Sequence, residues 1–425
     1  MWEETKLVSI HSSEILHVLE SFARFPHKVK DFEQIISEGL NETTSVDKKI
    51  IRRNTTTPQI SGCELIYSGP HIFAGNPLYK TPRNTCKLNS DYDIINLNNI
   101  SDDFVPKTNY TPLVSLQQFR GIIPGFHIGT DIDGKAMYDC WMDYYKMGFR
   151  RMIGSDSERS LSGGILMKNC LNIGGVVTTT FKDSRQLIEF AGLTSSLPLD
   201  FYVKTLGISD IHASRILTFP LGIPTQYQKQ LAVRTLLLNC LTSHYSALWE
   251  ECWDASYFND SWSILDKRMP NFKELHSKWN HNTPLRNYFS RRLALIETDV
   301  IVSMALGLTL EELETIYSVQ FPIMQQYEID TYYDAEGNIV FTPNRGLIGV
   351  GLDRKSWEAM RGTLSDDGMT YSGSSETYEH TIDPSKSELY GGQKVTYYAP
   401  YNRCDRIEDY RRAWAHFEKV FKEEQ

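Results

Sequence analysis

The sequence changes character at the prolines Pro220 and Pro224. Before them, residues 63–124 are rich in Gly, Pro, Asn and Asp and carry only short apolar runs, which is typical of short strands and structured loops. After them, residues 227–251 and 284–307 place apolar side chains at the spacing of amphipathic helices. A mixed part followed by a mostly helical part predicts an α+β fold.

Shorter patterns add detail to this prediction. Residues 163–181 (GGILMKNCLNIGGVVTTTF) have apolar and β-branched runs on both sides of a polar turn, which predicts strand–turn–strand. The segment that follows predicts a helix capped by Asp183 or Ser184. A second helix cap is expected at Thr309, and the tail from Arg406 predicts a final helix.

The length of 425 residues is too great for one small domain. We expect a helical leader over residues 1–60, a mixed α/β domain over residues 61–222 and a mostly helical region over residues 223–425. Within the leader, helical spacing continues to about Leu40 with a break at Pro26. The last region includes a small C-terminal β-hairpin near residues 323–342.

The cysteines and the N-terminus predict a cytoplasmic protein. The 7 cysteines are odd in number and scattered, without a CxxC pair or zinc-ligand spacing, so we expect reduced thiols and no metal. The first residues contain acids where a signal peptide has basic side chains, and no apolar stretch is long enough to span a membrane.

The net charge of −9 disfavours nucleic-acid binding by the whole surface. Charge is unevenly distributed, however. Residues 144–215 contain nine basic and six acidic side chains, and residues 48–87 contain seven basic side chains and Glu64 as the one acid. A mildly basic face on an acidic body is therefore feasible.

Sequence motifs for several common activities are missing. The chain has neither the phosphate-binding loop GxxxxGK[ST] nor the hydrolase string GxSxG. Asn76-Pro77-Leu78-Tyr79 is close to the loop with which adenine amino-methyltransferases hold a flipped base, but its third position is Leu. Because no Gly-rich cofactor loop precedes it in the first 75 residues, we favour a Pro-stiffened structural loop.

Basic and amide side chains next to Gly-containing loops are the candidate DNA contacts, because such loops can approach a duplex closely. The turn over residues 168–175 and the loop over residues 205–214 provide Lys168, Asn169, Asn172, His212, Ser214 and Arg215. Three guanidinium groups near a Gly/Ser loop are candidates for phosphate binding: Arg150, Arg151 and Arg159. The loop over residues 69–83 brings together His71, Asn76, Tyr79, Lys80 and Arg83. Three roles stay open for this loop: contact with the DNA backbone, the lining of a cleft together with Pro77, and a purely structural role.

Several strings resemble the C-terminal target-recognition portion of large type IIG-like adenine-N6 DNA methyltransferases, including those of DISARM defence systems. They are ELIYSGPHIFAGNPLYKTPR (64–83), DYDIINLNNISDDFVPKTNY (91–110), RMIGSDSERSLSGGILMK (151–168), LIEFAGLTSSLPLDFYVK (187–204), QFPIMQQYEIDTYYDAEGNIVFTP (320–343) and YYAPYNRCDRIEDYRRAWAHFE (397–418). The resemblance extends from about residue 40 to the end. It implies a DNA target-recognition domain over residues 61–222, followed by a scaffold that docks a partner.

In that family these segments follow the methyltransferase domain and choose the DNA sequence. The resemblance therefore implies a specificity subunit, or part of a split enzyme, that is not catalytic alone. Double-stranded DNA and a methyltransferase subunit are the expected partners, with other defence-system subunits as further ones. S-adenosylmethionine is expected in the methyltransferase partner and no cofactor in this chain. Two alternatives stay open: a degenerate adenine methyltransferase that uses Asn76–Tyr79, and a scaffold that does not bind DNA.

Overall fold

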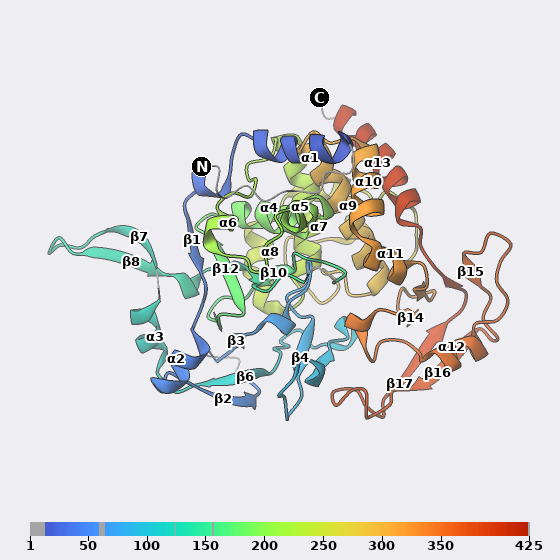
Figure 1. The fold of residues 1–425 in the computed structure, drawn as a ribbon, viewed down its shortest axis with the longest axis horizontal. Helices are drawn as coiled ribbons and strands as arrows, with labels where there is room; N and C mark the ends of the chain where they lie inside the picture. The colour runs from blue at the N-terminus through green and yellow to red at the C-terminus, as the bar shows by residue number, and fades with distance from the viewer. Residues whose placement is uncertain (1–12, 59–63, 124, 155–156, 424–425) are drawn as a thin grey trace.

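The structure is a computed structural model that describes residues 13–58, 64–123, 125–154 and 157–423 (Figure 1). The helices are α1 (Ser13–Arg24), α2 (Glu42–Asp47), α3 (Leu116–Ile122), α4 (Ser184–Ser195), α5 (Leu197–Thr205), α6 (Ala213–Ile216), α7 (Thr225–Asn239), α8 (Ser246–Glu251), α9 (Tyr288–Ala305), α10 (Leu310–Gln320), α11 (Pro322–Glu328), α12 (Arg354–Met360) and α13 (Arg406–Glu423). The strands form several small sheets, so the predicted α+β fold is confirmed.

One antiparallel sheet lies at the centre, in the order β1 (Gln34–Ser37), β12 (Val176–Phe181), β9 (Lys146–Arg150) and β10 (Gly163–Leu166). Every residue of β10 and β12 is buried, whereas β1 is a half-buried edge strand. Helix α4 packs on β9, β10 and β12, and begins as predicted where the Asp183 carboxylate accepts from the Arg185 N–H. The sheet is therefore covered and positions the loops at its ends.

The helices form a layer around α9, which is buried along almost its whole length. Helix α9 packs against α4, α7, α10 and α13, and α10 also packs against α1. The predicted cap of α10 is confirmed: Thr309 and Glu312 form a capping box. The main hydrophobic core runs from Ile15 to Phe421 and includes residues of all three predicted segments. The boundaries predicted near residues 60 and 222 thus lie within one packed body.

Small sheets surround this body. They are the pairs β2 (Ile51–Thr56) with β6 (Thr108–Pro112), β3 (Ile66–Tyr67) with β11 (Leu171–Asn172), β4 (Lys80–Pro82) with β5 (Tyr92–Ile94), and β7 (Gly125–Thr130) with β8 (Ala136–Cys140). The C-terminal part adds a sheet of β14 (Ile339–Phe341), β13 (Tyr332–Tyr333), β18 (Tyr401–Asn402) and β15 (Thr370–Tyr371), and the pair β16 (Thr377–Thr381) with β17 (Lys394–Tyr398). Figure 1 shows β7 and β8 projecting from the body as a hairpin.

The two strands predicted within residues 163–181 are present as β10 and β12, and β9 lies between them in the sheet. The structure corrects three other local predictions. The second half of the predicted leader helix is strand β1, which pairs with β12. The predicted helix over residues 227–251 breaks after Asn239, whose side chain accepts from the Ile165 N–H of β10. The hairpin near residues 323–342 consists only of β13 and β14, because α11 takes up its first part.

Two further observations concern the cysteines and membranes. The six cysteines in the described ranges are free thiols, as predicted for them, and Cys63 lies outside the described residues. Among the helices that the structure describes, none combines the length and the apolar character needed to cross a bilayer.

Candidate nucleic-acid interface

The two basic stretches of the sequence meet in one open groove with a volume of about 980 Å³. Strand β2 contributes Arg53, β4 contributes Lys80 and the loop after β4 contributes Lys87, while Arg150 comes from the end of β9. Among the described residues that line the groove, Glu42 is the one carboxylate, and it accepts from Arg53 Nε at 2.6 Å. The groove therefore has a positive lining on a negatively charged protein.

Arg150 is fixed by the loop over residues 69–79. Its Nε donates to the carbonyl oxygens of Gly69 (3.0 Å) and Ile72 (2.7 Å). Its guanidinium lies over the rings of Phe73 and Tyr79, 5.6 Å and 5.5 Å from their centroids. Burial lowers the pKa of Arg150, and no carboxylate of the described residues forms an ion pair with it. Arg150 is thus a preformed, poorly compensated cation at the groove.

Lys80 lies beside Arg150. Its ammonium nitrogen is 5.0 Å from the centroid of the Tyr79 ring. Burial, and then the positive charge of Arg150, lower the pKa of Lys80 to about 8. Both causes favour the neutral amine, so an approaching anion would stabilise the charged form of this side chain.

The groove also has neutral hydrogen-bonding groups at its base. The hydroxyl groups of Ser68 and Tyr92 are 3.1 Å apart, and Asn109 Nδ2 donates to Tyr92 at 2.7 Å and lies 3.3 Å from Cys86 Sγ. Below them, the Ser68 N–H donates to His71 Nδ1 at 2.9 Å, so His71 Nε2 carries the proton and donates to the Lys107 carbonyl. Burial lowers the pKa of His71 to about 4, which keeps this buried ring neutral near pH 7.

The structure brings together only Lys80 and Arg150 of the predicted DNA contacts in this groove. Lys168 and Asn169 are exposed in the turn after β10, where Lys168 Nζ lies 4.8 Å from the centroid of the Tyr145 ring. Ser214 and Arg215 are exposed on α6. These four residues do not line the groove, so they stay predictions for contacts elsewhere.

Arg151 and His212 form a separate cluster with acids. Arg151 lies 3.6 Å from Glu38 and 3.8 Å from Asp210, and His212 Nδ1 lies 3.0 Å from Glu38. A phosphate would have to compete with these carboxylates, which makes the cluster a weaker anion site than the groove.

Arg159, Asn172 and Arg83 hold the fold together instead of facing a ligand. The buried guanidinium of Arg159 donates to Asp200 at 2.5 Å and to the Ser195 carbonyl at 2.7 Å. Asn172 is buried and its Nδ2 donates to the Val176 carbonyl at 2.6 Å. Arg83 pairs with Asp93 at 2.9 Å and donates to the Lys386 carbonyl. These side chains are of the types that contact DNA, but their hydrogen-bond donors already bond to groups within the protein.

The loop Asn76-Pro77-Leu78-Tyr79 contributes Asn76 and Tyr79 to the lining of a second cavity. Pro77 is buried, and the Asn76 side chain accepts from the Leu78 N–H at 3.0 Å. The Tyr79 ring stacks on Phe73 with centroids 4.8 Å apart, and its hydroxyl donates to the Gly346 carbonyl at 2.7 Å. A flipped base could stack on Tyr79 only if the ring gave up its stacking on Phe73 or its hydrogen bond to the Gly346 carbonyl.

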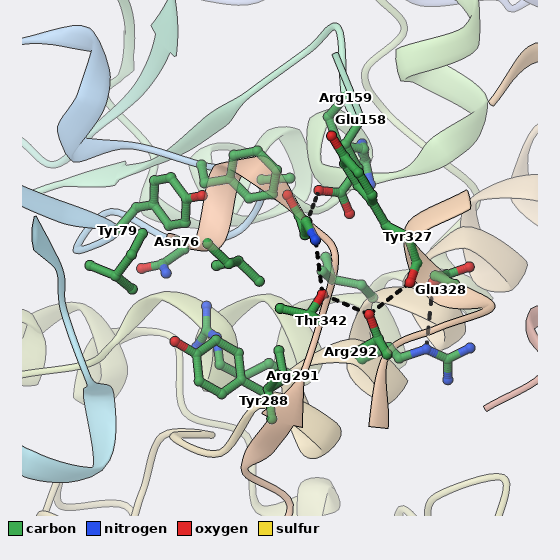
Figure 2. A pocket seen from close by; sticks show the side chains of 18 of the residues that line it. Asn76, Tyr79, Glu158, Arg159, Tyr288, Arg291, Arg292, Tyr327, Glu328 and Thr342 are labelled. Atoms are coloured by element: carbon green, nitrogen blue, oxygen red, sulfur yellow. Dashed lines mark hydrogen bonds and ion pairs between the residues drawn. The ribbon is translucent and has the colours of Figure 1, made fainter. Parts of the chain in front are cut away.

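The cavity that Asn76 and Tyr79 line has a volume of about 170 Å³ and is shown in Figure 2. A chain of hydrogen bonds crosses it: Asn344 Nδ2 donates to Glu158 (2.7 Å), the Asn344 N–H donates to the Thr342 hydroxyl (3.2 Å), and the hydroxyl groups of Thr342 and Thr331 are 2.8 Å apart. Burial raises the pKa of Glu158. Its carboxyl group forms no ion pair with the residues that the structure describes.

Sequence reasoning placed Arg53 and Lys87 in a basic stretch but did not select them as contacts. Both are exposed at the groove. Residues 53, 87 and 150 come to one groove only in the folded chain, so their common site could not be found from the sequence. The one available indication was the excess of basic over acidic residues between positions 48 and 87.

A comparison of the chain with models of protein families finds no match, and a comparison with curated proteins finds none either.

Proposed function

We propose that this chain recognises double-stranded DNA for an adenine-N6 methylation system of the restriction–modification or phage-defence type. The observation that carries DNA recognition is the convergence of Arg53, Lys80, Lys87 and Arg150 in one groove of an otherwise acidic protein. Adenine methylation as the purpose of the system is supported by the resemblance of residues 64–83 and the later strings to methyltransferase target-recognition regions.

The lining of the groove suits a polyanion. Four cations face one carboxylate, and backbone carbonyls rather than acids hold Arg150. The neutral amides and hydroxyls between them, such as Asn109 and Tyr92, are groups that read base edges or sugars. Phosphate binding by the cations would supply affinity, and the neutral groups would supply sequence preference.

Methyl transfer is assigned to a partner chain that binds S-adenosylmethionine. The sequence has no Gly-rich cofactor loop before Asn76, and the stacked Tyr79 has contacts that a base-binding aromatic would have to give up. On this proposal the chain provides the DNA surface and the partner provides the cofactor and the reacting groups, in the cytoplasm where both meet the genome.

A salt titration of DNA binding tests the proposal. Fluorescence anisotropy with a labelled duplex would measure the association constant from 50 to 200 mM salt, for the chain alone and with a candidate methyltransferase partner. If each of the four cations meets one phosphate, the slope of log K against log salt is about −3.6, and affinity falls about 150-fold over this range.

Substitution of Lys87 gives the matched comparison. Lys87 is exposed and its side chain makes no hydrogen bond with the described residues, so Lys87→Gln should reduce the slope by about 0.9 without loss of stability. Lys355→Gln, an exposed lysine on α12 outside the groove, is the control and should leave the slope unchanged. Partner binding without any duplex binding would support the scaffold alternative and refute the proposal.

A further inference from the structure

The cavity of Figure 2 contains two guanidinium groups that lack a carboxylate partner. Five arginines line it, and three of them are paired with acids: Arg159 with Asp200, Arg292 with Asp409 and Arg406 with Glu328. Arg286 and Arg291 form no ion pair with any carboxylate that the structure describes, and backbone carbonyls hold both of them. An uncompensated buried cation is costly, so this end of the cavity favours an anion.

Arg291 lines the cavity and retains donors that have no partner among the described residues. One terminal nitrogen donates to the carbonyls of Leu238 and Leu285, both at 2.9 Å, and the other donates to the Gly75 carbonyl at 2.8 Å. This leaves the Nε–H and one N–H of the second terminal nitrogen, which are the donors that a carboxylate accepts side by side. Burial lowers the pKa of Arg291 to about 9, Tyr288 opposes this shift and Arg286 adds to it.

Two neutral donors lie at the same end. Tyr288 is three residues before Arg291 on α9, and its hydroxyl makes no hydrogen bond with the described residues. Asn76 follows Gly75, and its side-chain amide nitrogen also has no partner in the described part of the chain. Figure 2 shows Asn76, Arg291 and Tyr288 on one side of the cavity and Glu158 on the other.

The remaining walls and the volume define the body of the ligand. Ile94, Leu97 and Leu295 contribute apolar surface, and Met324 and Leu347 add more. A dry cavity of about 150 Å³ holds one benzene molecule, and this cavity measures about 170 Å³. The space therefore fits a single ring or a branched chain, and a fully hydrated inorganic anion would leave the apolar walls unused.

We propose that this cavity binds a small monocarboxylate with an apolar body about the size of one ring, with its carboxylate on Arg291 and Tyr288. Glu158 lies across the cavity from this end, and burial raises the pKa of its carboxyl. This site is separate from the DNA groove, and its binding of a monocarboxylate does not depend on the proposed DNA recognition.

Calorimetry with benzoate as the probe tests the site on the full chain, without DNA. We expect saturable binding of one benzoate per chain, with a dissociation constant roughly between micromolar and millimolar for nine heavy atoms. Benzamide, which has the same shape and no charge, should bind at least about tenfold more weakly, because a hydrogen bond to a charged group is the stronger one. Equal affinity for benzoate and benzamide would overturn the proposal, as would the absence of benzoate binding at 20 mM.

Methyl NMR locates the probe. In protein labelled at the methionine methyl groups, benzoate should shift the Met324 signal, assigned by the Met324→Leu variant, because Met324 lines the cavity. Met360, buried in the separate C-terminal core, is the internal control and should not move. Benzoate-dependent shifts that spare Met324 would place the ligand elsewhere and refute the site.

Two substitutions test the carboxylate contact. Arg291→Met should abolish benzoate binding, and Arg354→Met, at an exposed ion pair on α12, should not change it. Arg291 also holds three carbonyls, so the Met variant is first checked for cooperative melting. Tyr288→Phe keeps the ring and should weaken benzoate about tenfold and benzamide less, because a carboxylate accepts the stronger hydrogen bond. Unaltered benzoate affinity in Tyr288→Phe and in a folded Arg291→Met would contradict the assignment.

Discussion

DNA binding by the groove should weaken between pH 7 and pH 9 because of Lys80. An exposed lysine has a pKa of about 10.4 and stays charged over this range. Burial and Arg150 lower the pKa of Lys80 to about 8, so its charge is lost within it. The perturbation is therefore a change of pH that removes the charge of Lys80, whereas the hydrogen bond to Glu42 raises the pKa of Arg53.

The size of the effect follows from this pKa. With a pKa of about 8, roughly nine-tenths of Lys80 is charged at pH 7 and roughly one-tenth at pH 9. If only the ammonium form contacts a phosphate, the association constant falls about tenfold, which corresponds to about 1.4 kcal/mol.

Stability should change in the opposite direction. The folded pKa of Lys80 lies below its unfolded value, so the unfolded chain binds more protons between about pH 8 and pH 10.5. The contribution of Lys80 to the free energy of unfolding therefore rises with pH in this window. Weaker DNA binding at pH 9 thus cannot be explained by unfolding due to this group, and a thermal melt at each pH checks that point.

The assay is anisotropy with one duplex at pH 7, 8 and 9, at constant ionic strength. Lys80→Arg is the matched variant, because a guanidinium stays charged at pH 9 and should remove the pH dependence while keeping affinity. Lys80→Gln should also remove the pH dependence, at the affinity that the native protein has at pH 9. A tenfold loss that persists in Lys80→Arg would refute the assignment to Lys80.

Three further predictions concern the interior. Arg159→Met should lower the free energy of unfolding by about 3–5 kcal/mol in denaturant titration, because it leaves Asp200 buried without its cation, yet any folded fraction should keep the native salt slope. The arginines Arg406 and Arg292 overcome the effect of burial and lower the pKa of Glu328 to about 2, so the native protein should lose stability in melts as the pH falls from about 4.5 toward 2. Glu328→Gln should abolish the part of this loss that the carboxyl causes. Tyr79→Phe should cost about 1 kcal/mol of stability through the lost bond to the Gly346 carbonyl and change duplex affinity less than twofold; a large loss of affinity would instead indicate that Tyr79 touches DNA.

Local periodicity predicted the helices well where one face is apolar and a cap is present. Helices α4 and α10 begin at Asp183 and Thr309 as expected, because these caps are formed by side chains within one turn. Strand partners were not predictable in the same way. Residues 163–166 and 176–181 look like a hairpin in the sequence, but β9, from an earlier segment, lies between them. The strands β10 and β12 lie close together in the sequence, but each of them pairs with β9 and not with the other.

The site shows the same limit for charged residues. Arg150 and Arg159 belong to the same basic stretch of the sequence, yet Arg150 lies at the groove and Arg159 meets Asp200 of α5 in the interior. The acid that decides the role of Arg159 is 41 positions away, so no local pattern could reveal it. Basic composition indicated which stretch approaches a ligand, and only packing determined which side chains remain available.

The ionic contacts between α9, α11 and α13 have a consequence for synthesis of the protein. Arg292 and Asp299 of α9 are buried, and their partners Asp409, Arg406 and Tyr410 belong to the last helix. During translation Asp299 is made more than a hundred residues before Arg406 and Tyr410, and a charge buried alone is costly. The core around α9 should therefore close only after the ribosome has released α13. Nascent chains that stop short of Arg406 should be open, protease-sensitive intermediates.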